Sequence, residues 1–280
     1  MHETIAKIGS PNPLVGVLTE PTNTDGGKTA IILLNSGVMH RVGACRLSVK
    51  IARAVALETG LLCLRFDFSG IGDSEARRAS GADFGRAAVA EVVEAMDHLQ
   101  VRHGIEQFIL YGLCSGALIA CNTAEVDARI VAIAQIDGCC YPTPKSYLSY
   151  YASRLWSVEG WRMRFFRWFR GGRNVDNNDS ILLGGKADFE IPEFADDPGK
   201  AAVSTQLATL MARGLCLHCI FTGRELHYRY RTQYRDCYSK VDFGDALSLD
   251  YYPYASHIFT EPVYQRDMIA GFVGWIKKIN

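Results

Sequence analysis

Residues 108–120 read FILYGLCSGALIA, and this stretch decides the fold. A short apolar run ends at Gly112, Cys114 follows two residues later, and Gly116 comes two residues after that. The small residues beyond Gly116 favour a helix. The stretch therefore predicts a buried strand, a very tight turn and then a helix.

A cysteine between two such glycines fits the nucleophile elbow, G-x-S-x-G, with cysteine in the place of serine. The glycines are required because a Cβ atom there would collide with the neighbouring strand or helix. Cys114 is therefore the candidate nucleophile. Ser115 is a poorer candidate, because choosing it puts Leu113 and Ala117 where the glycines must be. The alternative for Cys114 is a buried, inert thiol.

Size and composition narrow the class of protein. The 280 residues suit one large α/β domain with an insertion. Basic and acidic residues number 30 each, and no basic block indicates a nucleic-acid partner. The sequence shows neither the pattern of a signal peptide nor an apolar run long enough to span a bilayer. With no export signal, the nine cysteines favour a reduced, cytoplasmic location.

Apolar runs alternate with helical patterns along the chain. We expect strands at residues 14–20, 30–34, 61–66, 108–112, 130–136, 215–221 and 246–251. We expect helices at residues 44–58, 87–99, after the elbow, at 201–212 and at 263–279. Strands that alternate with helices, several of them apolar on both faces, predict a mostly parallel sheet covered by helices on both sides.

The composition changes after Cys140, where aromatic residues and arginines become dense. We expect residues 141–200 to form a helical cap over the sheet, inserted between two parts of the core, 1–140 and 201–280. Trp156 and Trp161 are candidate substrate-binding residues in this cap. Four arginines either form a solvated face or a positive rim for phosphopantetheine or another anionic group: Arg162, Arg164, Arg167 and Arg170.

A cysteine nucleophile needs a base, and the base needs an acid to orient it. Behind an elbow of this kind, the acid and then the histidine follow the nucleophile along the chain. His257 lies between the last predicted strand and the terminal helix, so it is the candidate base. Glu225 follows the preceding strand and is the candidate acid. Asp137 and Asp250 remain alternatives, because each could accept the second N–H of the imidazole.

The loop after the strand at 30–34 is expected to complete the site. The oxyanion hole should combine the backbone N–H of Ser115 with that of Gly37 or Val38. His40 and Arg41 are close enough in sequence to bind substrate, although a solvated loop explains them equally well.

No metal or cofactor is predicted. Cys216 and Cys219 have the spacing of a ligand pair, but strand alternation sends them to opposite faces and no second pair exists. The glycines at 70 and 72 lack the spacing of a dinucleotide site.

Taken together, these residues resemble the α/β-hydrolase superfamily. The resemblance rests on the order elbow, acid, histidine, on NSG at 35–37 and on RFDFSGIGDS at 65–74. The run 35–47, with Arg41, Gly43 and Arg46, together with GLCSGA at 112–117, is similar to cysteine-nucleophile hydrolases associated with exosortase systems. TGRE at 222–225 looks like the acid-bearing turn of the family, although aspartate is usual there.

The resemblance implies an α/β-hydrolase fold and acyl chemistry on an ester, thioester or lactone. Dienelactone hydrolases and polyhydroxyalkanoate synthases share the cysteine elbow, so the chemistry spans hydrolysis and transfer. A thioester on Cys114 reacts readily with amines and carbanions, and an aromatic cap excludes water, so both features favour transfer. The expected partner is a small acyl substrate, free or carried by CoA or phosphopantetheine. The alternative is a catalytically silent binding module on the same scaffold.

Overall fold

The computed structural model describes residues 1–22, 27–77, 83–148, 198–224 and 228–280. Its centre is an eight-stranded sheet in the order β1-β2-β4-β3-β5-β6-β7-β8. The strands are β1 (His2–Ile8), β2 (Leu14–Glu20), β3 (Thr29–Leu33), β4 (Leu62–Phe66), β5 (Gln107–Leu113), β6 (Ile130–Ile136), β7 (Cys216–Thr222) and β8 (Leu247–Tyr252). The β1–β2 and β2–β4 pairs are antiparallel and the others are parallel.

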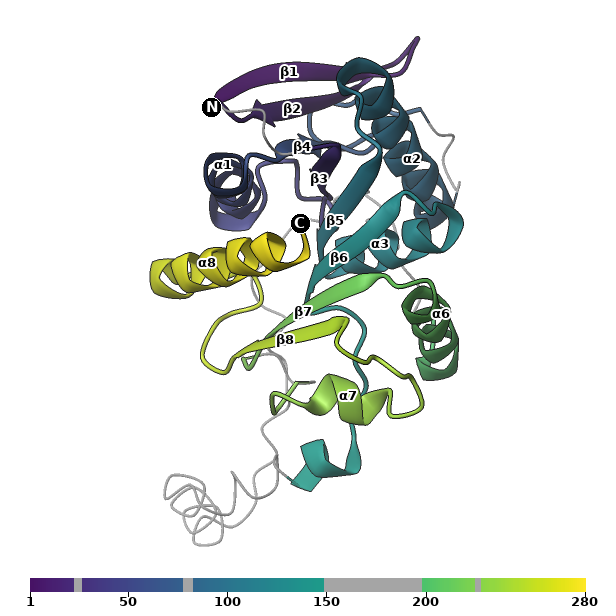
Figure 1. The fold of residues 1–280 in the computed structure, drawn as a ribbon, viewed down its shortest axis with the longest axis vertical. Coiled ribbons are helices and arrows are strands. Elements are labelled where there is room, and N and C mark those ends of the chain that lie inside the picture. Colours follow the sequence, from purple (N-terminus) through teal and green to yellow (C-terminus); the bar gives the residue numbers. More distant parts are fainter. Residues whose placement is uncertain (23–26, 78–82, 149–197, 225–227) are drawn as a thin grey trace, which may run out of the picture.

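Helices cover both faces of this sheet (Figure 1). They are α1 (Leu47–Thr59), α2 (Phe84–His103), α3 (Ser115–Val126), α6 (Lys200–Ala212), α7 (Gln233–Cys237) and α8 (Pro262–Ile279). Helices α1 and α8 lie on one face, and α2, α3 and α6 lie on the other. Each face encloses its own apolar core, because the strands present buried side chains in both directions. The predicted α/β-hydrolase architecture is confirmed in these layers.

The strand register brings five loops to one edge of the sheet. In the parallel pairs, Leu33 lies opposite Tyr111 and Ile136 lies opposite both Leu113 and Ile220. The strands β3, β5, β6, β7 and β8 therefore all end at the same edge. Ligands of open parallel sheets bind outside the carboxyl ends of the strands, so this edge is where a site is expected.

Two elements were not predicted from the sequence. Strand β1 alternates polar and apolar residues at the edge of the sheet, and only Ala6 and Ile8 are buried along it. Helix α7 has five residues, too few for a helical period to stand out. The predicted helix at 44–58 is divided: a 3₁₀ turn at Ala44–Arg46, with positive φ at Cys45 and Arg46, precedes α1.

Most of the predicted cap, residues 149–197, lies outside the described residues. Trp156, Trp161 and the four cap arginines belong to this part. The cap and its boundaries therefore stay predictions. Among the helices that are described, none combines the length and the apolar character needed to cross a bilayer.

Candidate active site

Cys114 stands on a sharp turn between β5 and α3. Its backbone has φ 54° and ψ −114°, which is a costly conformation for a residue with a side chain. A Cβ on Gly112 would lie 2.2 Å from the backbone carbonyl of Gly116. A Cβ on Gly116 would lie 2.6 Å from the backbone carbonyl oxygen of Asn35. The two glycines therefore let the strand, the helix and the neighbouring loop pack closely, while the Cys114 side chain is exposed.

The Cys114 thiol is paired with the imidazole of His257. Hydrogen bonding to His257 lowers the pKa of Cys114 below its usual value, and the backbone N–H of Ser115 acts in the same direction. Partial burial opposes this shift. A lowered pKa favours the thiolate, which is the nucleophilic form of cysteine. The structure thus brings together the two residues that the sequence assigned as nucleophile and base.

The acid beside the imidazole is Asp137, at the end of β6. His257 Nδ1 lies 2.8 Å from Asp137 Oδ2. The hydrogen bonds to Asp137 and Cys114 raise the pKa of His257 to about 10. An imidazole held this way carries its proton at neutral pH, beside a thiol whose pKa is lowered.

Thr222, the last residue of β7, holds the Asp137 carboxylate in place. Its backbone N–H donates to Oδ1 at 2.8 Å and its hydroxyl donates to Oδ2 at 2.7 Å. The carboxylate thus accepts hydrogen bonds from Thr222 and His257 together. Sequence reasoning missed this role of Thr222, although it is the first residue of the TGRE turn at 222–225.

The other two acids considered from the sequence are Glu225 and Asp250. Glu225 lies outside the described residues, so its position is not assigned. Asp250, in β8, pairs instead with His218, whose Nε2 lies 3.0 Å from Asp250 Oδ2. His218 is fully buried and packs against Trp275. Of the three carboxylates considered from the sequence, Asp137 is the one that contacts His257 in the described part of the chain.

The loop after β3 lies against the start of α3. The N–H of Gly37 donates to the Ser115 hydroxyl at 2.8 Å. Gly37 has a φ of 52°, which glycine adopts readily. Val38 follows with an exposed side chain, and its N–H has no acceptor within the part of the chain that the structure describes. The predicted oxyanion loop is thus beside the elbow.

Arg41 is tied to acidic side chains rather than free in solvent. Its guanidinium forms ion pairs with Asp67 and Asp73, and the Asp67 side chain is fully buried. Asn35 Nδ2 also donates to Asp67, at 3.4 Å, and to the Met39 carbonyl at 2.7 Å. These bonds join the loop after β3 to the loop after β4. His40, in contrast, is exposed.

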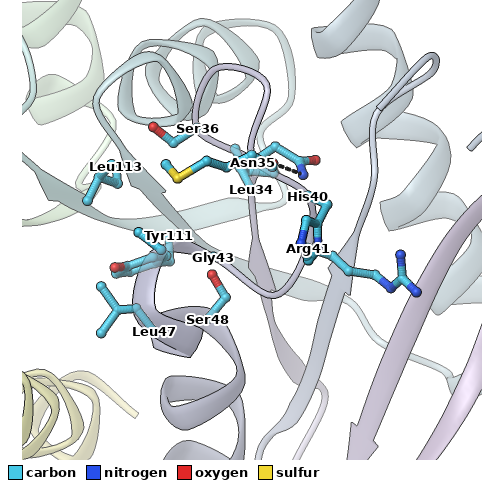
Figure 2. A pocket seen from close by; sticks show the side chains of 12 residues that line it. Leu34, Asn35, Ser36, His40, Arg41, Gly43, Leu47, Ser48, Tyr111 and Leu113 are labelled. Atoms are coloured by element: carbon cyan, nitrogen blue, oxygen red, sulfur yellow. Dashed lines mark hydrogen bonds between the residues drawn. The ribbon is translucent and has the colours of Figure 1, made fainter. Parts of the chain in front are cut away.

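A small cavity of about 20 Å³ lies beneath the loop after β3. Figure 2 shows Tyr111, Leu47 and Leu113 on one side of it, with the Arg41 guanidinium directed away from them. Leu113, next to the elbow cysteine, lines this cavity, whereas Cys114 and His257 do not. The buried Tyr111 hydroxyl has no hydrogen-bond partner among the described residues.

Comparison with known proteins decides the family. A family model described as the alpha/beta hydrolase fold matches residues 29–179, which is more than half of the chain. The chain belongs to the α/β-hydrolase fold family. In this α/β hydrolase, Cys114, Asp137 and His257 follow one another along the chain in the order that the fold uses for nucleophile, acid and histidine.

Solved structures agree with this α/β-hydrolase fold. An esterase of Pyrococcus furiosus is 14% identical, with a TM-score of 0.60 over 99% of this chain and 90% of that one. A proline iminopeptidase of Mycobacterium smegmatis is 14% identical, with a TM-score of 0.59 over 97% and 98% of the two chains. A lidless α/β serine hydrolase of Xanthomonas campestris is 14% identical, with a TM-score of 0.58 over 99% and 94%. No curated protein matches the sequence.

Proposed function

We propose that this α/β hydrolase is an acyl-transfer enzyme that acts through Cys114, His257 and Asp137. The observation that supports it best is the hydrogen-bonded series from the elbow thiol through the imidazole to the Asp137 carboxylate. Nucleophile, base and acid in mutual contact are what covalent acyl chemistry needs. The acid assigned here is Asp137, in place of the Glu225 favoured from the sequence.

The reaction begins when the Cys114 thiolate attacks the carbonyl carbon of an ester, thioester or lactone. The carbonyl oxygen becomes an oxyanion, which accepts a hydrogen bond from the Ser115 N–H and one from the loop after β3. As the carbon–oxygen or carbon–sulfur bond breaks, the His257 imidazolium gives its proton to the leaving alkoxide or thiolate, which becomes an alcohol or thiol. Asp137 stabilises the imidazolium throughout, and the product of this step is a thioester on Cys114.

The second step releases the acyl group. Neutral His257 takes a proton from water or from an acceptor amine or alcohol, which attacks the thioester and regenerates the thiolate–imidazolium pair. We propose a small acyl substrate, free or carried by CoA or phosphopantetheine, with the cap residues Trp156 and Trp161 and the loop residues His40 and Arg41 as binding residues. The similarity to cysteine-nucleophile hydrolases associated with exosortase systems supports the cysteine branch of the family, and nine free thiols suit a cytoplasmic enzyme.

Mass spectrometry of the intact protein after incubation with p-nitrophenyl acetate tests the proposal. We expect one acetyl group on the wild type, none on Cys114→Ala, and a normal adduct on Cys45→Ala, which removes the other exposed cysteine. A catalytically silent binding module would give no adduct and no p-nitrophenol. Adding amine or alcohol acceptors then separates the two outcomes: transfer gives an acylated acceptor, whereas hydrolysis gives only acetate.

A further inference from the structure

The hydroxyl of Ser115 lies between the elbow and the loop after β3. Its oxygen accepts the Gly37 N–H at 2.8 Å, while the backbone N–H of the same residue reaches the Cys114 sulfur. Ser115 is therefore in contact with both halves of the expected oxyanion hole. One of the two loop amides considered as an oxyanion donor, that of Gly37, is already used in this contact.

A serine hydroxyl has one proton to donate as well as lone pairs that accept. In this site the oxygen is the acceptor toward Gly37, so its proton must be directed elsewhere. The structure gives that proton no acceptor among the residues it describes, and Ser115 is only partly buried. A donor that is polarised by the Gly37 N–H, and that belongs to the residue directly after Cys114, is thus available beside the reacting sulfur.

We infer that the Ser115 hydroxyl is a catalytic donor to the oxyanion, so that Ser115 contributes two hydrogen bonds, one from its N–H and one from its Oγ–H. The Gly37 amide then acts through the hydroxyl instead of directly. This inference rests on the proposed acyl chemistry at Cys114. It adds a side-chain donor to a site in which only backbone donors were expected.

The alternative role for the same contact is a blocking one, in which the hydroxyl accepts the Gly37 N–H until a substrate oxygen displaces it. The two roles predict opposite effects of one substitution, Ser115→Ala, on the rate of acylation. If the hydroxyl is a donor, Ser115→Ala slows acylation. If it only blocks Gly37, Ser115→Ala frees that amide and acylation is unchanged or faster.

The experiment compares two reactions of the same thiol in wild type, Ser115→Ala, Ser115→Thr and Ser239→Ala. Acylation by p-nitrophenyl acetate passes through an oxyanion, whereas alkylation by iodoacetamide depends on the thiolate alone. Loss of one oxyanion donor typically slows such a reaction by about 10²-fold. We therefore expect acylation of Ser115→Ala to be slower by about that factor, while its alkylation rate stays that of the wild type.

Ser115→Thr keeps a hydroxyl and should recover much of the acylation rate. Ser239, an exposed serine in the turn after α7, is the matched control and should behave as wild type in both reactions.

The outcomes separate this inference from the proposed function. A wild type that gives neither an acetyl adduct nor p-nitrophenol overturns both. A wild type that acylates, with Ser115→Ala equally fast or faster, overturns the donor role alone. Parallel losses of acylation and alkylation also overturn it, because the hydroxyl would then act on the thiolate. The same conclusion follows if Ser115→Thr is as slow as Ser115→Ala. Thermal melting of each variant, compared with wild type, shows whether a loss comes from unfolding.

Discussion

His257 Nδ1 lies 2.8 Å from Asp137 Oδ2, although 120 residues separate them in the sequence. Asp137 directly follows β6, which pairs with β5, the strand that Cys114 directly follows, and the Asp137 N–H donates to the Ile220 carbonyl of β7 at 2.9 Å. The acid is therefore fixed by the sheet itself. Its φ of 46° is unusual for a residue with a side chain, and such strain is common where side chains are held for function.

Asp137→Asn should leave the fold intact and strongly reduce turnover. An amide in place of the carboxylate no longer stabilises the imidazolium and can hold the wrong tautomer, which in a comparable triad lowers kcat by about 10⁴-fold. Steady-state hydrolysis of p-nitrophenyl acetate measures the loss. Glu225→Gln is the matched variant and should lose far less. Equal losses in the two variants would contradict the assignment of Asp137.

The pH dependence of alkylation reports the pairing of Cys114 and His257. Because His257 lowers the pKa of Cys114, the thiolate is present at lower pH than for an ordinary cysteine, whose pKa is about 8.5. The rate of alkylation by iodoacetamide should rise with pH, and it should reach its plateau at a lower pH in the wild type than in His257→Ala. Identical profiles would show that the two groups do not interact in solution.

Turnover should also fall at high pH. The pKa of His257 is raised to about 10, so the imidazolium that protonates the leaving group persists through neutral pH and is lost as the pH approaches that value. Asp137→Asn removes the largest cause of this shift, so its high-pH limb should move to lower pH. A high-pH limb that stays in place in the variant would argue against the Asp137–His257 bond.

Gly116→Ala should destabilise the protein. The added Cβ would lie 2.6 Å from the Asn35 oxygen, and overpacking of this kind typically costs about 1–3 kcal/mol in the free energy of unfolding. Gly274→Ala, inside α8, is the control. No atom lies within 4 Å of its added Cβ, so alanine should stabilise by about 0.5–1 kcal/mol. Urea unfolding measures both, and similar effects of the two substitutions would contradict the close packing of the elbow.

Arg41→Ala should also destabilise, because it leaves the buried Asp67 carboxylate without its cation. Removing one partner of a buried ion pair typically costs about 3–5 kcal/mol. Asp73 is well exposed, so Asp73→Ala should cost no more than about 1 kcal/mol. If Arg41→Ala keeps its stability in urea but raises KM, then Arg41 contributes more to substrate binding, one of the two roles left open by the sequence, than to the stability of the loop.

Local patterns predicted most of the fold. The strand 130–136 was predicted at its observed limits, and the apolar face of the terminal helix is buried at Met268, Phe272 and Ile276. Strand β1 was missed because its alternating polar residues look like an exposed segment. The division of the predicted helix at 44–58 depends on backbone angles at Cys45 and Arg46 that their side chains do not indicate.

The site was predictable where one segment contains its own signal. The flanking glycines of Cys114 mark the elbow, and the position of His257 before the last helix marks the candidate base. The acid has no such signal, since Glu225, Asp137 and Asp250 all lie at or near strand ends. Thr222, at the end of β7, donates a hydrogen bond to Asp137. The two residues are 85 positions apart, and neither segment of sequence indicates that their strand ends are in contact. Arg41 likewise looked free because Asp67, its partner, is 26 residues away.

The position of Asp137 on the sheet has a mechanical consequence. Nucleophile and acid extend from neighbouring strands whose spacing the backbone ladder fixes, with the Cys114 N–H bonded to the Ile136 carbonyl at 2.9 Å. His257 alone is carried by a connection outside the sheet, between β8 and α8. Of the three groups, the imidazole is therefore the one that a shift of the connection between β8 and α8 would separate from the sulfur while the sheet stays unchanged.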